Sequence, residues 1–414
     1  MKTRILSNLN NPGQLERLYR ENKVAFRQEF NALYPELTGS PVADFWHERL
    51  NYDTEEAPWV SRSELLFVVI AALVAGTLAK LPQLLSIDPE FFYTRNVSFL
   101  VFPFLAAYFV RKNGVSTTKV AVLVGVCILS ALFINFLPDN PQSDTLVLSC
   151  IHLGLFLWAL TGFAFAGTGS EGLKKRLGYL RYNGDLIVMS TLLLISGFIM
   201  TAITIGLFSL IGLSIEEFYI QYIVIFGLPA VPLIGTVLIQ AIPQLVQKVS
   251  PVIARLFSPL VLITLLVYLG AIIFSGKDPY NDREFLMLFN ALLVGVMALI
   301  FFSVAERAKT PGNRYEIMII FLLSAVTILV NGIALSAIVF RIAEWGITPN
   351  RLAVLGANVL MLINLLLVTG KLVKVLTRDA DLTEVGKSIS VYLPVYWIWA
   401  AIVTFLFPLL FGFQ

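Results

Sequence analysis

Long apolar stretches separated by short polar gaps fill this chain from Glu64 to its last residue. Crossing a hydrocarbon core takes about 20 apolar residues in helical form, because an unpaired backbone group costs several kcal/mol in lipid. Nearly every stretch has that length, so we expect an all-α fold, a polytopic membrane helical bundle. The pattern predicts eleven transmembrane helices, over residues 64–85, 96–110, 116–137, 145–166, 185–212, 218–240, 255–275, 284–305, 316–341, 350–370 and 391–412.

The second stretch is the weakest of the eleven. It is about 15 residues long, shorter than a full crossing needs, and it has Pro103 inside. The alternative is a helix that begins upstream, near Phe91. If this stretch did not cross, every later helix would run in the opposite direction.

The Lys and Arg residues fall mostly in alternate gaps. The gaps after the even-numbered stretches hold sixteen, namely Arg111, Lys112, Lys119, Lys174, Lys175, Arg176, Arg181, Lys248, Arg255, Arg307, Lys309, Arg314, Lys371, Lys374, Arg378 and Lys387. The other five gaps hold Arg95, Lys277, Arg283, Arg341 and Arg351. Because Lys and Arg are retained on the cytoplasmic side, the alternation supports all eleven crossings together. It predicts a cytoplasmic N-terminus and an outside C-terminus.

Residues 1–62 are polar and predict a small cytoplasmic helical module ahead of the bundle, which occupies residues 63–414. Apolar residues at helical spacing predict an amphipathic helix that ends at Pro35, and Ser40 with Pro41 marks the next helix start. The spaced residues are Leu15, Leu18, Phe26, Phe30 and Leu33. A module of this size is too small to bury a core alone. We expect it to pack on the bundle, and the alternative is that it docks a soluble protein partner.

Composition narrows the possible chemistry. The chain is 57% hydrophobic and 14% charged, against roughly 25% charged in soluble domains. Cys127 and Cys150 lie inside predicted helices, which indicates buried thiols rather than disulfides or a metal cluster. With only His47 and His152, and with no nucleophile motif, carboxylate pair or zinc spacing, no catalytic residue, metal or cofactor is predicted. Nucleic acid is not an expected partner, and enzyme activity stays undecided.

One basic connection has the pattern of an interfacial helix. Leu173, Leu177 and Leu180 share a helical face, and four cations surround it: Lys174, Lys175, Arg176 and Arg181. Such a segment lies among anionic lipid headgroups. The alternative is a topology signal without a specific lipid.

Polar residues and helix breakers inside the stretches define a candidate cavity or path. Glycine and proline crowd the sixth stretch, which predicts a kinked or unwound helix, and transporters use broken helices to hold ions or substrates. The candidate residues are Gly227, Pro229, Pro232, Gly235, Thr201, Thr204, Thr327, Asn331 and His152. Helix packing explains the same residues without a substrate. Buried amides at Asn135, Asn290, Asn358 and Asn364 either line an aqueous path or join helices.

His152 and Lys80 lie well inside predicted helices. His152 is a default candidate for function there, although no carboxylate at similar depth completes a proton relay, so a neutral histidine is favoured. Lys80, near the outer end of the first helix, either extends its ammonium to the interface or binds an anion.

The turn between the ninth and tenth stretches predicts a well-defined helical hairpin. Gly346 suits the left-handed position after a helix, Thr348 can cap the next helix, and Pro349 suits its first position. Trp345 belongs at a membrane interface. The candidate outer-hairpin residues are Arg341, Glu344, Trp345, Gly346, Pro349, Asn350 and Arg351, and Glu344 is close enough in sequence to pair with either arginine.

The hairpin sequence RIAEWGITPNR, with RLFSPLVLITLLVYLGAI in the seventh stretch, resembles a bacterial family of polytopic membrane proteins that carries only a domain-of-unknown-function label. The resemblance covers residues 185–412 and implies a bacterial cytoplasmic membrane location. It supplies no reaction, substrate or residue role.

These features favour a permease-like or channel-like protein with an unknown substrate. Against this, many carriers have internal repeats, and none is evident here. One alternative is a membrane scaffold or signalling component that recruits a partner through the N-terminal module. Another is an enzyme acting on lipid-linked envelope intermediates at the outer hairpin.

Overall fold

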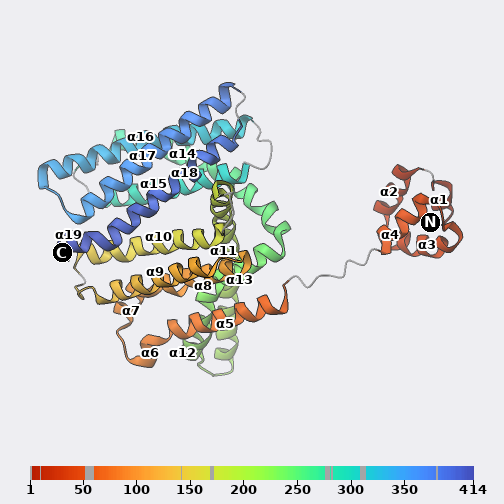
Figure 1. Ribbon diagram of the computed structural model, residues 1–414, viewed down its shortest axis with the longest axis horizontal. Coiled ribbons are helices and arrows are strands. Elements are labelled where there is room, and N and C mark those ends of the chain that lie inside the picture. The colour runs from red at the N-terminus through yellow and green to blue at the C-terminus, as the bar shows by residue number, and fades with distance from the viewer. Residues whose placement is uncertain are drawn as a thin grey trace. The chain divides into compact units, whose positions relative to one another are not determined.

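The computed structural model describes residues 2–9, 11–51, 60–140, 142–167, 172–275, 280, 283–307, 314–378 and 381–414. All regular elements in these ranges are helices (Figure 1). The short helices are α1 (Lys2–Ser7), α2 (Pro12–Glu21), α3 (Lys23–Leu37), α4 (Pro41–Asn51), α6 (Leu81–Leu85), α7 (Pro89–Asn96), η1 (Val97–Leu100), α8 (Phe102–Asn113), α12 (Glu216–Tyr219), η2 (Ile220–Val224), η3 (Ile402–Leu406) and α19 (Phe407–Leu410). The long helices are α5 (Arg62–Ala79), α9 (Thr117–Phe136), α10 (Asp144–Ala166), α11 (Gly172–Leu210), α13 (Ile225–Ala241), α14 (Pro243–Ser275), α15 (Arg283–Arg307), α16 (Arg314–Trp345), α17 (Pro349–Arg378) and α18 (Thr383–Ala401).

Ten helical segments in the described ranges are long and apolar enough to cross a membrane. They coincide with ten of the eleven predicted stretches, and many of their large apolar side chains are exposed. An apolar surface of this extent is suited to lipid rather than water. The prediction of an all-α polytopic membrane bundle is confirmed.

The second predicted stretch is not one uninterrupted helix. Residues 89–113 form α7, the 3₁₀ turn η1 and α8, with Pro103 in the first turn of α8. Arg95 Nε donates to the carbonyl of Ile134, near the end of α9, at 3.3 Å. Asn113 Nδ2 donates to Phe165 O, at the far end of α10, at 2.8 Å. Because α10 returns antiparallel to α9, these two contacts lie at opposite ends of the helix pair. The broken segment therefore extends along the pair from one end to the other.

The basic gaps after the even-numbered stretches meet at one end of the bundle. Ion pairs and hydrogen bonds join each of these gaps to another one. The links are Lys119 to Gly167 O (3.5 Å), Arg181 to Glu306, Arg255 to Glu316 (3.0 Å) and Arg314 to Leu376 O (3.2 Å). Lys277 and Lys309 lie outside the described residues, as do the side chains of Lys248, Arg283 and Arg378.

The bundle begins and ends at opposite ends of α10. Arg111 donates to Ser63, next to the start of α5, and Asn113 reaches the last turn of α10. Gln414 O accepts from the backbone N–H of Thr145, in the first turn of α10, at 2.9 Å.

The N-terminal residues form a separate unit, Met1–Ser61. It has its own core, centred on Phe26, Phe30 and Trp46, with ring centroids of Phe26 and Trp46 5.2 Å apart. The expectation that this module cannot bury a core by itself is therefore wrong, because aromatic side chains bury much area per residue. Asn22 also divides the predicted amphipathic helix, since its side chain accepts from Ala25 N at 3.0 Å and caps α3. The helix then continues past Pro35.

Glycines allow several helix pairs to approach closely. A Cβ at Gly184 in α11 would lie 2.1 Å from Cδ2 of Phe302 in α15. A Cβ at Gly356 in α17 would lie 2.1 Å from Trp399 in α18, and one at Gly76 in α5 would lie 2.2 Å from Phe226 in α13. Small residues of this kind let transmembrane helices pack without a hydrophobic driving force between them.

Candidate functional site

The glycine and proline cluster of the sixth stretch does not unwind its helix. Pro229 and Pro232 both lie inside the continuous helix α13, so of the two predicted forms the unwound one is wrong at residues 227–235, and a kink stays a prediction. The irregular turn lies upstream, where η2 is a single turn of π-helix. Gly227 is exposed, whereas Gly235 lets α11 approach, because a Cβ there would lie 3.2 Å from Leu186.

The remaining candidate path residues divide between two regions. Thr201 and Thr204 lie in the second half of α11, where most apolar side chains are exposed, and Thr204 Oγ1 donates to Met200 O at 2.7 Å. Thr327 and Asn331 are buried in α16. His152 Nδ1 lies 2.8 Å from Leu148 O on its own helix, which satisfies that nitrogen locally. The structure does not bring these residues into one site.

The α16 and α17 pair carries the most deeply buried polar groups. The two helices lie side by side in Figure 1, and Thr369 Oγ1 donates to Ser324 Oγ at 3.0 Å, which fixes their antiparallel register. Asn331 lies seven residues after Ser324, and residue 362 lies seven residues before Thr369, so both are about 10.5 Å from that hydrogen bond along the helix axes. Asn331 is therefore level with residue 362. Asn358 and Asn364 are therefore within about one helical turn, roughly 6 Å along the axis, of that level. We call Asn331, Asn358 and Asn364 the polar layer.

The polar layer has unmet hydrogen-bonding capacity. Asn358 Nδ2 donates to Asn290 Oδ1 in α15 at 2.9 Å, and Asn364 Nδ2 donates to the Tyr396 hydroxyl in α18 at 3.1 Å. The Oδ1 atoms of Asn358 and Asn364 have no partner among the described residues, and neither does either polar atom of Asn331, which is 0% exposed. Burying an amide without a partner costs roughly 1–3 kcal/mol in proteins. Oxygen atoms of this kind accept from water or coordinate a cation.

Half-buried amides elsewhere join helices. Asn96 and Asn135 exchange a pair of amide hydrogen bonds of 2.9 and 2.8 Å between α7 and α9. Trp158 Nε1 donates to Asn183 Oδ1 at 2.8 Å between α10 and α11. For Asn135, the sequence left open an aqueous path or a role in joining helices, and these hydrogen bonds support the second.

The predicted hairpin between the ninth and tenth stretches is confirmed in its backbone, and its position on the outer side stays a prediction. Gly346 has φ +76°, α16 ends at Trp345, and α17 begins at Pro349. Arg351 closes the turn, because its Nη1 donates to the carbonyls of Trp345 at 2.8 Å and Gly346 at 2.7 Å. Arg351 N also bonds Thr348 Oγ1 at 3.3 Å.

The charges of this hairpin are arranged differently from the prediction. Arg341 is buried, and its Nε donates to Tyr280 O at 2.8 Å. Both Arg341 and Arg351 lie 5.6 Å from the Trp345 ring. Glu344 is exposed, and no ion pair joins it to either arginine in the part of the chain that the structure describes. The hairpin, including half-buried Asn350, is thus held by backbone acceptors and an aromatic ring.

The basic segment at residues 174–181 is the first part of α11 rather than a separate interfacial helix. Leu177 and Leu180 pack in the main core of the bundle, so that the apolar face contacts protein. Arg176 donates to Ser390 O at 3.2 Å, and Arg181 pairs with Glu306. Lys174 is exposed and Lys175 half-buried.

An ionic cluster at the same end was missed by the sequence reasoning. The side chain of Glu306 is 2% exposed and that of Arg181 17%. Glu316 lies 3.4 Å from Arg307 Nε and 3.0 Å from Arg255 Nε. The signal was available, because these carboxylates stand at helix ends beside basic gaps, where ion pairs join neighbouring helices. The cluster ties α11, α14, α15 and α16 together.

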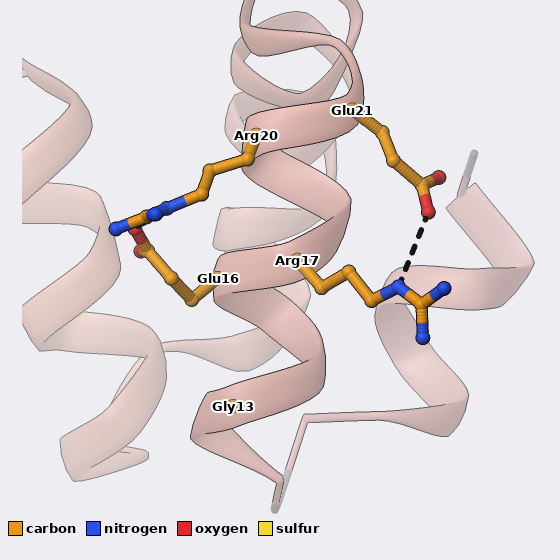
Figure 2. A pocket seen from close by; sticks show the side chains of 5 residues that line it. All are labelled: Gly13, Glu16, Arg17, Arg20 and Glu21. Carbon is orange, nitrogen blue, oxygen red and sulfur yellow. Dashed lines mark hydrogen bonds and ion pairs between the residues drawn. The ribbon is translucent and has the colours of Figure 1, made fainter.

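Figure 2 shows a shallow depression on α2 of the N-terminal module, lined by Gly13, Glu16, Arg17, Arg20 and Glu21. Glu16 lies 2.9 Å from Arg20 Nε and 3.0 Å from Arg49 Nη2. The hydrogen bond from Arg20, followed by the charge of Arg49, lowers the pKa of Glu16 below its ordinary value. Paired charges of this kind make a solvated helix face rather than a ligand site.

In the described residues, no group of three or more His, Cys, Asp or Glu side chains is placed to hold a metal ion. Comparisons of the chain with protein-family models, with curated proteins and with solved structures find no match.

Proposed function

We propose that this multi-pass membrane protein is a permease or channel for a small polar solute or cation, which passes the polar layer of Asn331, Asn358 and Asn364. The observation that supports it is Asn331, with both polar atoms buried and without a partner among the described residues. Polar residues near the middle of a membrane helix are costly, and in transporters they mark substrate or ion sites. Asn331 is near the middle of the apolar helix α16.

The side chains at the layer suit neutral or cationic solutes. Each of its three residues has an amide oxygen without a donor among the described residues. Amide oxygens accept hydrogen bonds and coordinate hard cations. The hydroxyls of Ser324 and Thr369, about two turns away, continue the polar surface along the same helix pair.

The membrane placement belongs to the same proposal. The end of the bundle where the basic gaps meet faces the cytoplasm by the positive-inside rule. The N-terminal module is then cytoplasmic and Gln414 outside. A bacterial cytoplasmic membrane is the location that the resemblance of the RIAEWGITPNR hairpin supports. On this placement, Lys174 and Lys175 are positioned for anionic headgroups of the inner leaflet.

The test is solute flux in proteoliposomes. Wild-type protein should raise the permeability of vesicles to at least one member of a panel of small neutral solutes and monovalent cations. Asn331→Leu should lower that flux about tenfold or more, which is the effect of losing one polar contact of about 1.4 kcal/mol or more. Its stability should be kept or raised, because an unpaired buried amide is removed.

Thr204→Val is the matched control, since Thr204 bonds its own helix on the exposed half of α11. Its flux should equal that of wild type. If wild-type vesicles were no more permeable than empty ones across the panel, or if Asn331→Leu conducted as well as Thr204→Val, the transport proposal would be refuted.

A second candidate function, recruitment of a soluble partner, is favoured by one observation on the N-terminal module. Phe45 is 63% exposed on a unit that already has its own aromatic core. Exposed aromatic side chains are typical of binding hot spots. Crosslinking from a photoreactive residue at position 45 in cells should yield one dominant adduct, and its absence would count against this role.

A further inference from the structure

Lys80 stands between α5 and α6 and is buried. The residue is 8% exposed, and its Nζ has no hydrogen-bond partner among the described residues. The ammonium is therefore enclosed by protein, and its placement at the membrane interface stays a prediction. The neighbouring backbone carbonyl is also occupied, because Ala79 O accepts from the Tyr93 hydroxyl at 2.8 Å.

The ring of Tyr222 covers the ammonium, with its centroid 3.1 Å from Lys80 Nζ. Tyr222 belongs to the π turn η2. One helical turn away, Gly76 and Phe226 form the close approach of α5 to α13. The two contacts share one face of α5, because Gly76 and Lys80 are four residues apart. The close packing at Gly76 thus holds the π turn over the lysine.

The ring alone does not balance the charge. A cation–π contact offsets only a small part of the hydration free energy that an ammonium loses on burial. Glu217 is the nearest acid in sequence on the covering segment, and its carboxylate accepts from Gln221 Nε2 at 3.0 Å. No carboxylate of the described residues lies within ion-pair distance of Lys80 Nζ. The site therefore lacks the anion that its charge requires.

The position of the site favours the phosphate of a lipid as that anion. Lys80 follows directly on the candidate span Arg62–Ala79, at the level where a bilayer has its headgroups. The covering ring is 50% exposed, and Ile220 and Ile223 beside it are 51% and 50% exposed. Leu84 and Leu85 in α6 are 59% and 63% exposed. A lipid therefore reaches the ammonium from the apolar surface when the Tyr222 ring turns aside.

We propose that Lys80 is the anchor of an anion site that binds a phosphate group, with Tyr222 as its movable cover. This site is independent of the transport proposal, because it lies on α5 and η2 rather than on α16 and α17. The ammonium makes charge-assisted hydrogen bonds to the phosphate oxygens, which supply the acceptors that the protein lacks. A free phosphate ion has the same chemistry, so the experiment compares the two sources.

The experiment is native mass spectrometry of the full-length protein after delipidation. It is titrated separately with phosphatidylglycerol, with diacylglycerol, which lacks the phosphate, and with inorganic phosphate. Phosphatidylglycerol should bind wild type at least about tenfold more tightly than Lys80→Met, the effect of one charge-assisted bond. Diacylglycerol should not distinguish the two proteins. Lys374→Met is the matched control, since Lys374 is exposed on α17, and it should bind like wild type.

The outcomes are separable. If inorganic phosphate rather than the lipid shows the Lys80-dependent affinity, the anion comes from solution and the site stands. If neither probe distinguishes Lys80→Met from Lys374→Met, the site does not exist. Should Lys80→Met not fold, amine labelling of wild type decides the question. Phosphatidylglycerol or phosphate should then slow labelling of Lys80 relative to Lys374, and an unchanged ratio overturns the proposal. Tyr222→Leu should speed the labelling of Lys80 in the delipidated protein.

Discussion

Gly184→Ala tests the contact between α11 and α15. The added Cβ would lie 2.1 Å from Cδ2 and 2.2 Å from Cε2 of Phe302. The aromatic ring must therefore move, or the helices must separate. Overpacking of this kind costs about 1–3 kcal/mol. Alanine also stabilises a helix by about 1 kcal/mol relative to glycine, so the net change alone is ambiguous.

Gly197→Ala removes this ambiguity. Gly197 lies in the same helix, and nothing is within 4 Å of a Cβ at this position. The helix-propensity gain is common to both variants and cancels in their difference. Gly197→Ala should therefore be more stable than Gly184→Ala by about 1–3 kcal/mol.

The assay is equilibrium unfolding in mixed micelles titrated with sodium dodecyl sulfate. Phe302→Leu in the Gly184→Ala background should recover part of the lost stability, because a smaller side chain faces the new methyl group. A difference below about 0.5 kcal/mol between the two alanine variants, the usual scatter of surface changes, would show that α11 and α15 do not approach as closely as stated.

Two further predictions concern charged groups. The Arg95 side chain is 1% exposed and donates to the carbonyls of Ile134, Leu137 and Pro138, whereas its ion-pair partner Asp139 is 61% exposed. In the same unfolding assay, Arg95→Met should cost about 3 kcal/mol and Asp139→Asn less than about 1, and equal losses would contradict this account. The lowered pKa of Glu16 means that its contribution to module stability is complete above the pKa of the unfolded state and is lost as pH falls through the lower folded value. In Glu16→Gln, the stability of the module should therefore fall less than in wild type as the pH is lowered below about 4.5. Fluorine NMR of fluorotryptophan at Trp46 measures the unfolding, and an acid transition equal to that of wild type would refute the effect.

The positions of the helices could be predicted from the sequence, because apolar length is a local property. Ten of eleven stretches became long helices. The exception, residues 96–110, has Pro103 inside it, and Val97–Leu100 forms a 3₁₀ turn before α8. The outer hairpin was predictable for the same local reason, since the backbone requirements of Gly346 and Pro349 depend on neighbouring residues only.

The partners of polar side chains could not be predicted. Whether Arg181 meets a lipid phosphate or Glu306 depends on the rotation of α11 about its axis and on which helix packs against it. The sequence also grouped Thr204 with Asn331, although the two residues lie in an exposed half-helix and a buried core. Hydropathy does not distinguish a polar residue that bonds its own backbone from one whose donors and acceptors stay unpaired.

The sequence by itself determined a membrane-spanning helical chain, and its alternating cations fell at one end of the bundle, because burial length and charge retention act on each segment separately. The tertiary structure decided where unbalanced polarity remains. Lys80 directly follows an apolar helix and Asn331 lies within one, and their burial without a hydrogen-bond partner among the described residues arises only when α13 covers α5 and when α17 covers α16. Those long-range contacts depend on how whole helix faces pack against each other, so they cannot be predicted from the sequence of a single segment.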